Sequence, residues 1–95
     1  MAFQEEFPDY PVAQMPIIPA GWRDTSWRND QCPSFTAHGV QVFIDFADPN
    51  EREFPESPRF IVSADPEVHD HNEPLMETDD WQAVLDYVAA EKVVA

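Results

Sequence analysis

The longest β-favouring run in the chain is residues 39–46, and its side chains alternate in character. In an extended conformation, one face of this run carries Val40, Val42, Ile44 and Phe46, and the other carries Gln41, Phe43 and Asp45. Alternation with a period of two predicts a β-strand with one face in a core. We therefore expect residues 39–46 to form the central strand of a small sheet.

Shorter segments on either side of this run predict its neighbours in the sheet. Residues 34–37 predict a short strand that reaches the central strand through a tight turn at His38 and Gly39. Residues 48–51 (Asp-Pro-Asn-Glu) predict the turn that ends the central strand. Arg59–Ala64 predicts the next strand along the chain.

The C-terminal part predicts one amphipathic helix that runs to about Glu91. Thr78 is the expected N-cap, and Asp79 and Asp80 are expected in the first turn, where the helix macrodipole favours negative charge. The i, i+3, i+4, i+7 positions of an apolar stripe are Trp81, Val84, Leu85 and Val88. We expect this stripe to pack against the sheet.

The first 20 residues differ from the rest of the chain. They contain four prolines, which disfavour helix, yet they also carry many apolar side chains. We expect a proline-rich extended arm, with Met15–Ile18 as an edge strand, that lies against the domain or docks on a partner or a second copy of the chain. Residues 21–95 are expected to form a single domain.

Taken in order, these elements predict an α+β fold, with a small antiparallel sheet of about three strands packed on one C-terminal helix. The irregular segment between the arm and the first strand carries Trp22 and Trp27. We expect Trp27 and Trp81 in the core. For Trp22 the sequence leaves two roles open, a core position and a binding anchor, since tryptophan is enriched at interface hot spots.

The charge balance restricts the partners of this protein. Nineteen acidic residues and five basic ones give a formal net charge of −14. Such a surface repels nucleic acid and anionic membranes and attracts basic proteins, so we expect no direct nucleic-acid binding and no membrane association. A single cysteine and an N-terminus without a signal pattern favour a cytoplasmic protein, in the host cytoplasm if a phage encodes it.

Residues that could carry chemistry are few and isolated. His69 and His71 would lie on one side of an extended segment, as metal ligands could, but a solvated polar loop explains them more simply. Cys32 precedes a proline and is expected to be a small core residue rather than a nucleophile. Helix capping explains Asp79 and Asp80 better than an acid/base pair does. We therefore predict a protein that is not an enzyme and that has no cofactor and no metal site.

The acidic residues are unevenly distributed along the chain. Residues 60–91 contain nine of them and no lysine or arginine. We expect the long polar connection 65–77 and the start of the helix to lie on one edge and to form a concentrated negative face. The candidate partner-binding residues are Asp65, Glu67, Asp70, Glu73, Asp79, Asp80 and Asp86, with Trp22 as an apolar anchor. A second acidic group follows the central strand and comprises Asp45, Asp48, Glu51, Glu53 and Glu56.

One block of the sequence resembles known proteins. Residues 21–35 (GWRDTSWRNDQCPSF), together with Asp79-Asp80-Trp81, look like small uncharacterised proteins of phages and bacteria, over about residues 20–90. That resemblance implies no activity and no catalytic residue. In size, acidity and lack of a catalytic signature, the chain is also similar to anti-CRISPR proteins and other DNA-mimicking inhibitors.

These observations favour a phage or mobile-element inhibitor that blocks a basic, nucleic-acid-binding surface of a host protein. Carboxylates would then stand in for phosphates. One alternative is a phage structural or assembly protein that self-associates through residues 1–19. Another is a small metal-binding protein that uses His69 and His71. We expect a monomer or a homodimer. A monomer that is unchanged by removal of residues 1–19 would favour the inhibitor, and a change of oligomer would favour the assembly protein.

Overall fold

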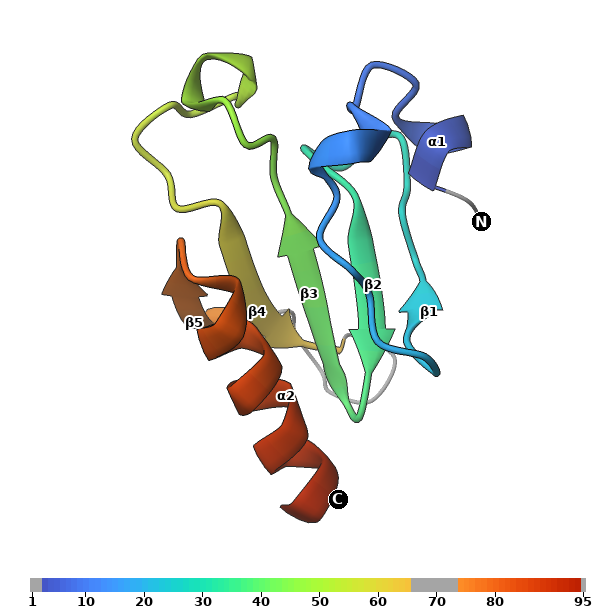
Figure 1. Cartoon of the computed structure of the whole chain (residues 1–95), viewed down its shortest axis with the longest axis vertical. Coiled ribbons are helices and arrows are strands. Elements are labelled where there is room, and N and C mark those ends of the chain that lie inside the picture. The colour runs from blue at the N-terminus through green and yellow to red at the C-terminus, as the bar shows by residue number, and fades with distance from the viewer. Residues whose placement is uncertain (1–2, 66–73, 95) are drawn as a thin grey trace.

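Five antiparallel strands form one sheet, in which strands that follow each other in sequence are also neighbours in space (Figure 1). The computed structural model describes residues 3–65 and 74–94. Its strands are β1 (Arg23–Asp24), β2 (Ser34–Ala37), β3 (Val40–Ile44), β4 (Phe60–Ala64) and β5 (Pro74–Thr78), and its C-terminal helix is α2 (Trp81–Val94). The α+β class is confirmed, but the sheet has five strands rather than about three.

The two strands that the sequence did not predict lie at the edges of the sheet. β1 has only two residues and sits in a polar, irregular segment. β5 lies within the segment predicted as a long connection, and it begins with a proline, which is tolerated at the start of an edge strand. Pairing with β4 holds β5 in place, because Val62 faces Met76 and Phe60 faces Thr78.

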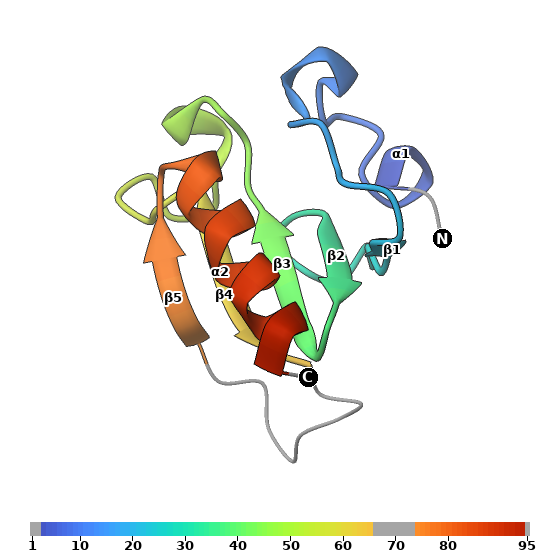
Figure 2. The ribbon, with the colours of Figure 1, turned by 60° about the horizontal axis from the view of Figure 1, so that its bottom comes forward.

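Helix α2 covers one face of the sheet, and the core lies between them (Figure 2). At the centre of the sheet, Val42 on β3 pairs with Phe35 on β2 and with Val62 on β4, and all three are buried. From α2, Val84 and Val88 are buried against this layer. The predicted apolar stripe is thus present, although its other two members, at positions 81 and 85, are only half-buried.

The opposite face of β3 is also shielded, because its polar side chains bond to one another. Gln41 Nε2 donates to Ser34 Oγ at 3.0 Å, and the hydroxyl of Thr25 lies 3.0 Å from those of Ser34 and Thr36. Gln41 and Ser34 are buried. The face of β3 that lies opposite its apolar side chains is therefore covered by a layer of hydrogen-bonded polar side chains. Buried polar groups need such partners.

The turn between β2 and β3 matches its prediction. His38 has φ 51° and Gly39 has φ 82°, and Ala37 pairs with Val40 across them. Two successive residues with positive φ define the type I′ turn that joins tightly twisted hairpin strands. Glycine adopts this conformation without steric cost, so the dipeptide sets the register of both strands.

The N-terminal arm packs on its own domain and is partly helical. One turn of helix, α1 (Phe3–Glu6), and a 3₁₀ turn, η1 (Val12–Gln14), replace the extended conformation that we predicted. Met15–Ile18 is not a strand. Tyr10 is buried in the core cluster and donates its hydroxyl to the carbonyl oxygen of Asp45 at 3.0 Å. The prolines thus limit helix length without preventing single turns.

Arm and domain are also joined by a charged contact. Arg28 donates from Nη2 to Glu6 Oε2 at 3.2 Å, and its backbone N–H donates to Glu6 Oε1 at 3.0 Å. These bonds lower the pKa of Glu6 below its ordinary value, with the Arg28 side-chain bond as the main cause. The Glu6 carboxylate is therefore held in its ionised form at the base of the arm.

The start of α2 and one tryptophan differ from prediction. Thr78 belongs to β5, and the cap of α2 is Asp80, whose Oδ1 accepts the N–H of Gln82 at 3.0 Å. Neither Asp79 nor Asp80 lies inside the first turn, because β5 carries the extended chain on to Thr78. Trp27 is 51% exposed instead of lying in the core.

Candidate functional site

Two segments far apart in sequence meet at one end of the sheet. The loop 46–59 leaves β3 and returns as β4, and the connection from β5 to α2 reaches the same end. The backbone N–H of Arg59 donates to Asp79 Oδ1 at 2.8 Å, which joins the two segments directly. Exposed carboxylates on these segments belong to Asp48, Glu51, Glu53, Glu56, Asp79 and Asp80. We call this surface the anionic end.

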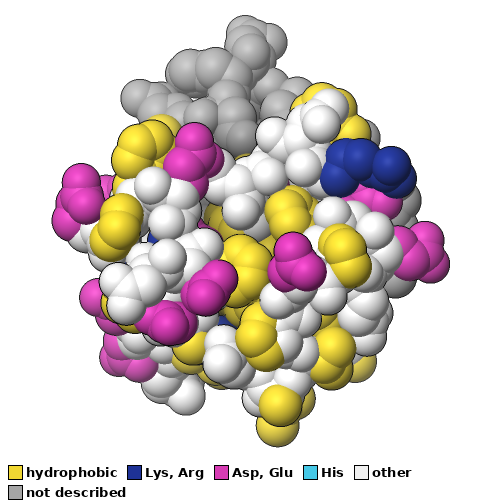
Figure 3. Space-filling view, turned by 90° about the horizontal axis from the view of Figure 1, so that it is seen from above, with side chains coloured by type: hydrophobic (Ala, Val, Ile, Leu, Met, Phe, Trp, Pro, Cys, Tyr) yellow, Lys and Arg dark blue, Asp and Glu magenta, His cyan; other side chains and the backbone are white. Residues whose placement is uncertain are grey.

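The anionic end lies toward the top of the molecule as drawn in Figure 1. Figure 3, which looks down on that end, shows acidic side chains most numerous on the left of the view, with others at the centre and right and hydrophobic side chains between them. Phe54, on the same loop, is 49% exposed. The surface thus combines negative charge with apolar contact area.

The loop of the anionic end is braced from within. Asp48 caps the 3₁₀ turn η2 (Pro49–Glu51) by accepting the N–H of Asn50 at 3.0 Å. Arg52 donates to three backbone carbonyl oxygens of the same loop, those of Phe46, Ala47 and Ser57, at 2.7, 3.3 and 2.7 Å. A half-buried guanidinium therefore closes the loop and leaves its carboxylates at the surface.

Arg59 ties the other side of the loop to the arm. Its guanidinium donates to the carbonyl oxygens of Asp45 and Gln14, at 3.1 and 2.6 Å, and to the hydroxyl of Tyr10 at 3.2 Å. Both arginines at this end thus direct donors to backbone oxygens. Because the guanidinium groups of Arg52 and Arg59 face the backbone, they offset the negative potential of the exposed carboxylates only in part.

The predicted partner-binding residues fall into three groups. Asp79 and Asp80 lie at the anionic end, and Asp86 is exposed on α2, where it accepts a bond from Gln82 Nε2 at 3.0 Å. Asp65 is buried at the opposite end of β4, and its N–H donates to the carbonyl oxygen of Gly39. Glu67, Asp70, Glu73, His69 and His71 lie outside the described residues.

The expectation of a single edge formed by the connection 65–77 and the helix start is not met by the described residues. Asp65 follows β4 at the far end of the sheet from Asp79, and residues 74–77 belong to strand β5. The helix start instead meets the second acidic group, which was not among the predicted partner-binding residues. In the sequence, this group was marked by its run of acidic residues after the central strand and by the turn at Asp48 and Pro49.

Trp22 combines packing with accessibility. Its ring lies 5.8 Å from that of Trp81 in an edge-to-face arrangement, and the side chain is half-buried. It lines a cavity of about 260 Å³ beside α2, together with Leu85 and Val88. The structure therefore places Trp22 at the margin of the core, against the first residue of α2.

The described residues provide neither a reactive thiol nor a cluster of metal ligands. Burial raises the pKa of the Cys32 thiol well above its ordinary value, with nearby Asp45 and Asp30 adding to the effect, so the thiol is a poor nucleophile. Within residues 3–65 and 74–94, no three potential ligands from histidine, cysteine, aspartate or glutamate gather into a metal site. No helix in this part of the chain has the length and apolar character to span a bilayer.

The chain was compared with protein-family models, with curated proteins and with solved structures, and none of them matches it. The resemblance of residues 21–35 to small phage and bacterial proteins thus stays a prediction. The geometry of the anionic end is what points to a function.

Proposed function

We propose that this protein is a non-enzymatic binding module that docks its anionic end on a Lys/Arg-rich, nucleic-acid-binding surface of another protein. The observation that carries the proposal is the meeting of loop 46–59 with the start of α2, which places exposed carboxylates from both segments on one surface. Carboxylates stand in for phosphates there. In a phage or mobile element, such a module is an inhibitor of the DNA-mimic or anti-CRISPR type.

Electrostatics supports this role in two ways. A net charge of −14 steers a basic partner toward the molecule and raises the association rate at low salt. Complementary charges also suppress wrong partners, because juxtaposed like charges cost several kcal/mol. Binding of this kind weakens as salt is added, since surface charges are screened beyond about 8 Å at physiological ionic strength.

The internal bracing of the surface supports the same role. Arg52 and Arg59 hold the loop through backbone oxygens, so its carboxylates are presented by a closed loop rather than by a loose one. Association is stronger when less ordering is required on binding. Exposed Phe54 adds an apolar contact of the kind that interfaces use beside charge.

A matched pair of charge-reversal variants tests the proposal. The first changes Glu51, Glu53 and Glu56 to Lys, and the second changes Glu5, Asp9 and Asp86 to Lys, all of them exposed residues. The net charge shifts equally in both variants. In pull-downs from host lysate at low salt, we expect the wild type and the second variant to capture nucleic-acid-binding proteins. Added duplex DNA should displace these proteins from the bait.

The first variant should bind the same proteins about tenfold more weakly, equivalent to about 1.4 kcal/mol. Added salt should release the captured proteins from the wild type. Equal capture by both variants would attribute binding to net charge alone and remove the anionic end as the site. Capture that duplex DNA does not displace would contradict the mimicry of nucleic acid.

A further inference from the structure

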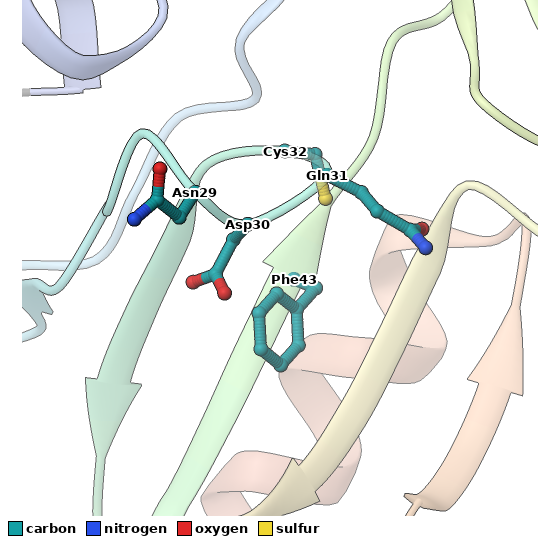
Figure 4. A pocket seen from close by; sticks show the side chains of 5 residues that line it. All are labelled: Asn29, Asp30, Gln31, Cys32 and Phe43. Carbon is teal, nitrogen blue, oxygen red and sulfur yellow. The ribbon is translucent and has the colours of Figure 1, made fainter.

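A second cavity lies on the face of the sheet opposite α2, under the turn that precedes β2 (Figure 4). Its volume is about 350 Å³, which is within the range of small-ligand sites. The cavity is lined by Asn29, Asp30, Gln31, Cys32 and Phe43. Phe43 belongs to β3 and pairs with Ser34 and Ile61, so its ring stands on the face turned away from the core helix.

The lining combines an aromatic surface with a carboxylate. Figure 4 shows the Asp30 carboxylate and the Phe43 ring on the same side of the turn, with Asn29 and Gln31 extending in opposite directions from it. Both Asp30 and Phe43 are half-buried. Partial burial raises the pKa of Asp30 above its ordinary value, because the carboxylate loses hydration there.

We propose that this cavity receives an arginine side chain of a partner protein, whose guanidinium stacks on Phe43 and pairs with Asp30. A planar cation fits an aromatic face, and its forked donors fit a carboxylate. Asn29 and Gln31 form the polar margins of the cavity on either side of this pair. Lysine lacks both the plane and the fork, so the site favours arginine.

Trp27 supports a partner at this position. It lies on the same turn, where the N–H of Asp30 donates to the carbonyl oxygen of Trp27 at 2.9 Å, and it is 51% exposed. Tryptophan is enriched among the residues that anchor protein interfaces, so its exposure on the turn that lines the cavity fits a partner there. An anionic ligand is disfavoured by Asp30 and by the net charge of −14.

That a partner protein supplies this arginine rests on the proposed function, in which the partner surface is rich in lysine and arginine. Binding of arginine to the cavity is tested separately, without the partner. The probes are N-acetyl-arginine amide, N-acetyl-lysine amide and N-acetyl-citrulline amide, the last being an uncharged isostere of the first. Backbone amide resonances of Asp30, Cys32 and Phe43 are followed in ¹H–¹⁵N spectra of the full chain. We expect saturable shifts with the arginine probe, weaker binding of the lysine probe and none of the citrulline probe.

Two variants and one titration separate recognition from a loss of fold. Asp30→Asn should weaken arginine binding about tenfold, as expected for a lost charge-assisted pair, and Asp9→Asn, the same change at an exposed residue outside both surfaces, should leave it unchanged. Resonances far from the turn report whether each variant is folded. In the wild type, the bound guanidinium should lower the pKa of Asp30, which a carbon-detected pH titration measures.

Equal affinity for the citrulline and arginine probes, or no saturable shift at millimolar arginine probe, would overturn the proposal. So would an Asp30→Asn variant that binds arginine as well as the wild type does. These outcomes are independent of the pull-down result for the anionic end, because the spectra report binding of a single arginine at the cavity residues alone. Failure of the pull-down likewise leaves the probe measurement intact.

Discussion

Asp45, at the end of the central strand, is a buried acid that the fold partly compensates. Its Oδ1 accepts the N–H of Phe46 at 2.8 Å, and Arg52 and Arg59 lie near enough to favour the ionised form. Burial outweighs these effects and raises the pKa of Asp45 above its ordinary value of 3.8. The folded protein therefore binds this proton more readily than the unfolded chain does.

The sign of the pH dependence follows from that difference. Above the raised folded-state pKa of Asp45, the charged carboxylate destabilises the fold; as pH falls through that value toward 3.8, this destabilisation disappears. We predict that Asp45→Asn, which keeps an oxygen acceptor for Phe46, raises the urea midpoint at pH 7. The gain over wild type should shrink as pH falls through the window. A lower midpoint at pH 7 would show that the two arginines outweigh burial.

At the scale of the element, α2 depends on a connection of only two residues. Asp79 accepts the N–H of Arg59, and Asp80 accepts the N–H of Gln82, so each carboxylate satisfies a backbone donor. The helix then rests on the sheet through the buried side chains of Val84 and Val88. Asp79 and Asp80 thus serve the fold as well as the anionic end, whereas the glutamates of loop 46–59 lie only at the surface.

Replacement of the cap residue Asp80 measures how much it contributes to the stability of the fold. Asp80→Ala should lower the free energy of unfolding by about 1 kcal/mol, because a first-turn N–H loses its acceptor. Asp86→Ala, with the same charge change on the same helix, should cost only about 0.2–0.5 kcal/mol through its contact with Gln82. Urea denaturation of the two variants provides the comparison. Equal losses would mean that charge, not capping, controls the stability of α2.

At the scale of the whole molecule, negative charge is crowded and the positive charge beside it faces inward. The net charge is −14, and the guanidinium groups of Arg52 and Arg59 bond to backbone oxygens beneath the anionic end. The arm adds a further constraint, since Tyr10 and Gln14 bond to the same region of the domain. The cost of self-repulsion is therefore concentrated at one end of the molecule.

Salt should relieve that repulsion. Raising ionic strength from 0.01 M to 0.15 M shortens the Debye length from about 30 Å to about 8 Å, so we predict a higher Tm in the saltier buffer. For a domain of this size, each 1 kcal/mol gained raises Tm by about 4–8 °C. The variant with Lys at positions 51, 53 and 56 should melt higher at low salt and respond less to added salt. A Tm that falls with salt in the wild type would contradict concentrated repulsion.

The sequence by itself determined the elements whose signals are local. The alternation of residues 39–46 predicted the strand that the structure shows as β3, and the dipeptide His38-Gly39 predicted the hairpin turn. The helical spacing of Trp81, Val84, Leu85 and Val88 predicted the apolar stripe of α2, of which Val84 and Val88 are buried. Each signal lies within a few residues of the element that it specifies. Backbone sterics and the burial of one face are sufficient to read such signals.

Only the tertiary structure decided what depends on pairing across the chain. β5 exists because β4 offers it an edge, and its five residues carry Asp79 away from Asp65 and bring it to Arg59. The membership of the anionic end was therefore invisible in the sequence, as was the cavity that Asp30 and Phe43 line together. The physical reason is that strand pairing and long-range hydrogen bonds are set by partners distant in sequence, which no local pattern records.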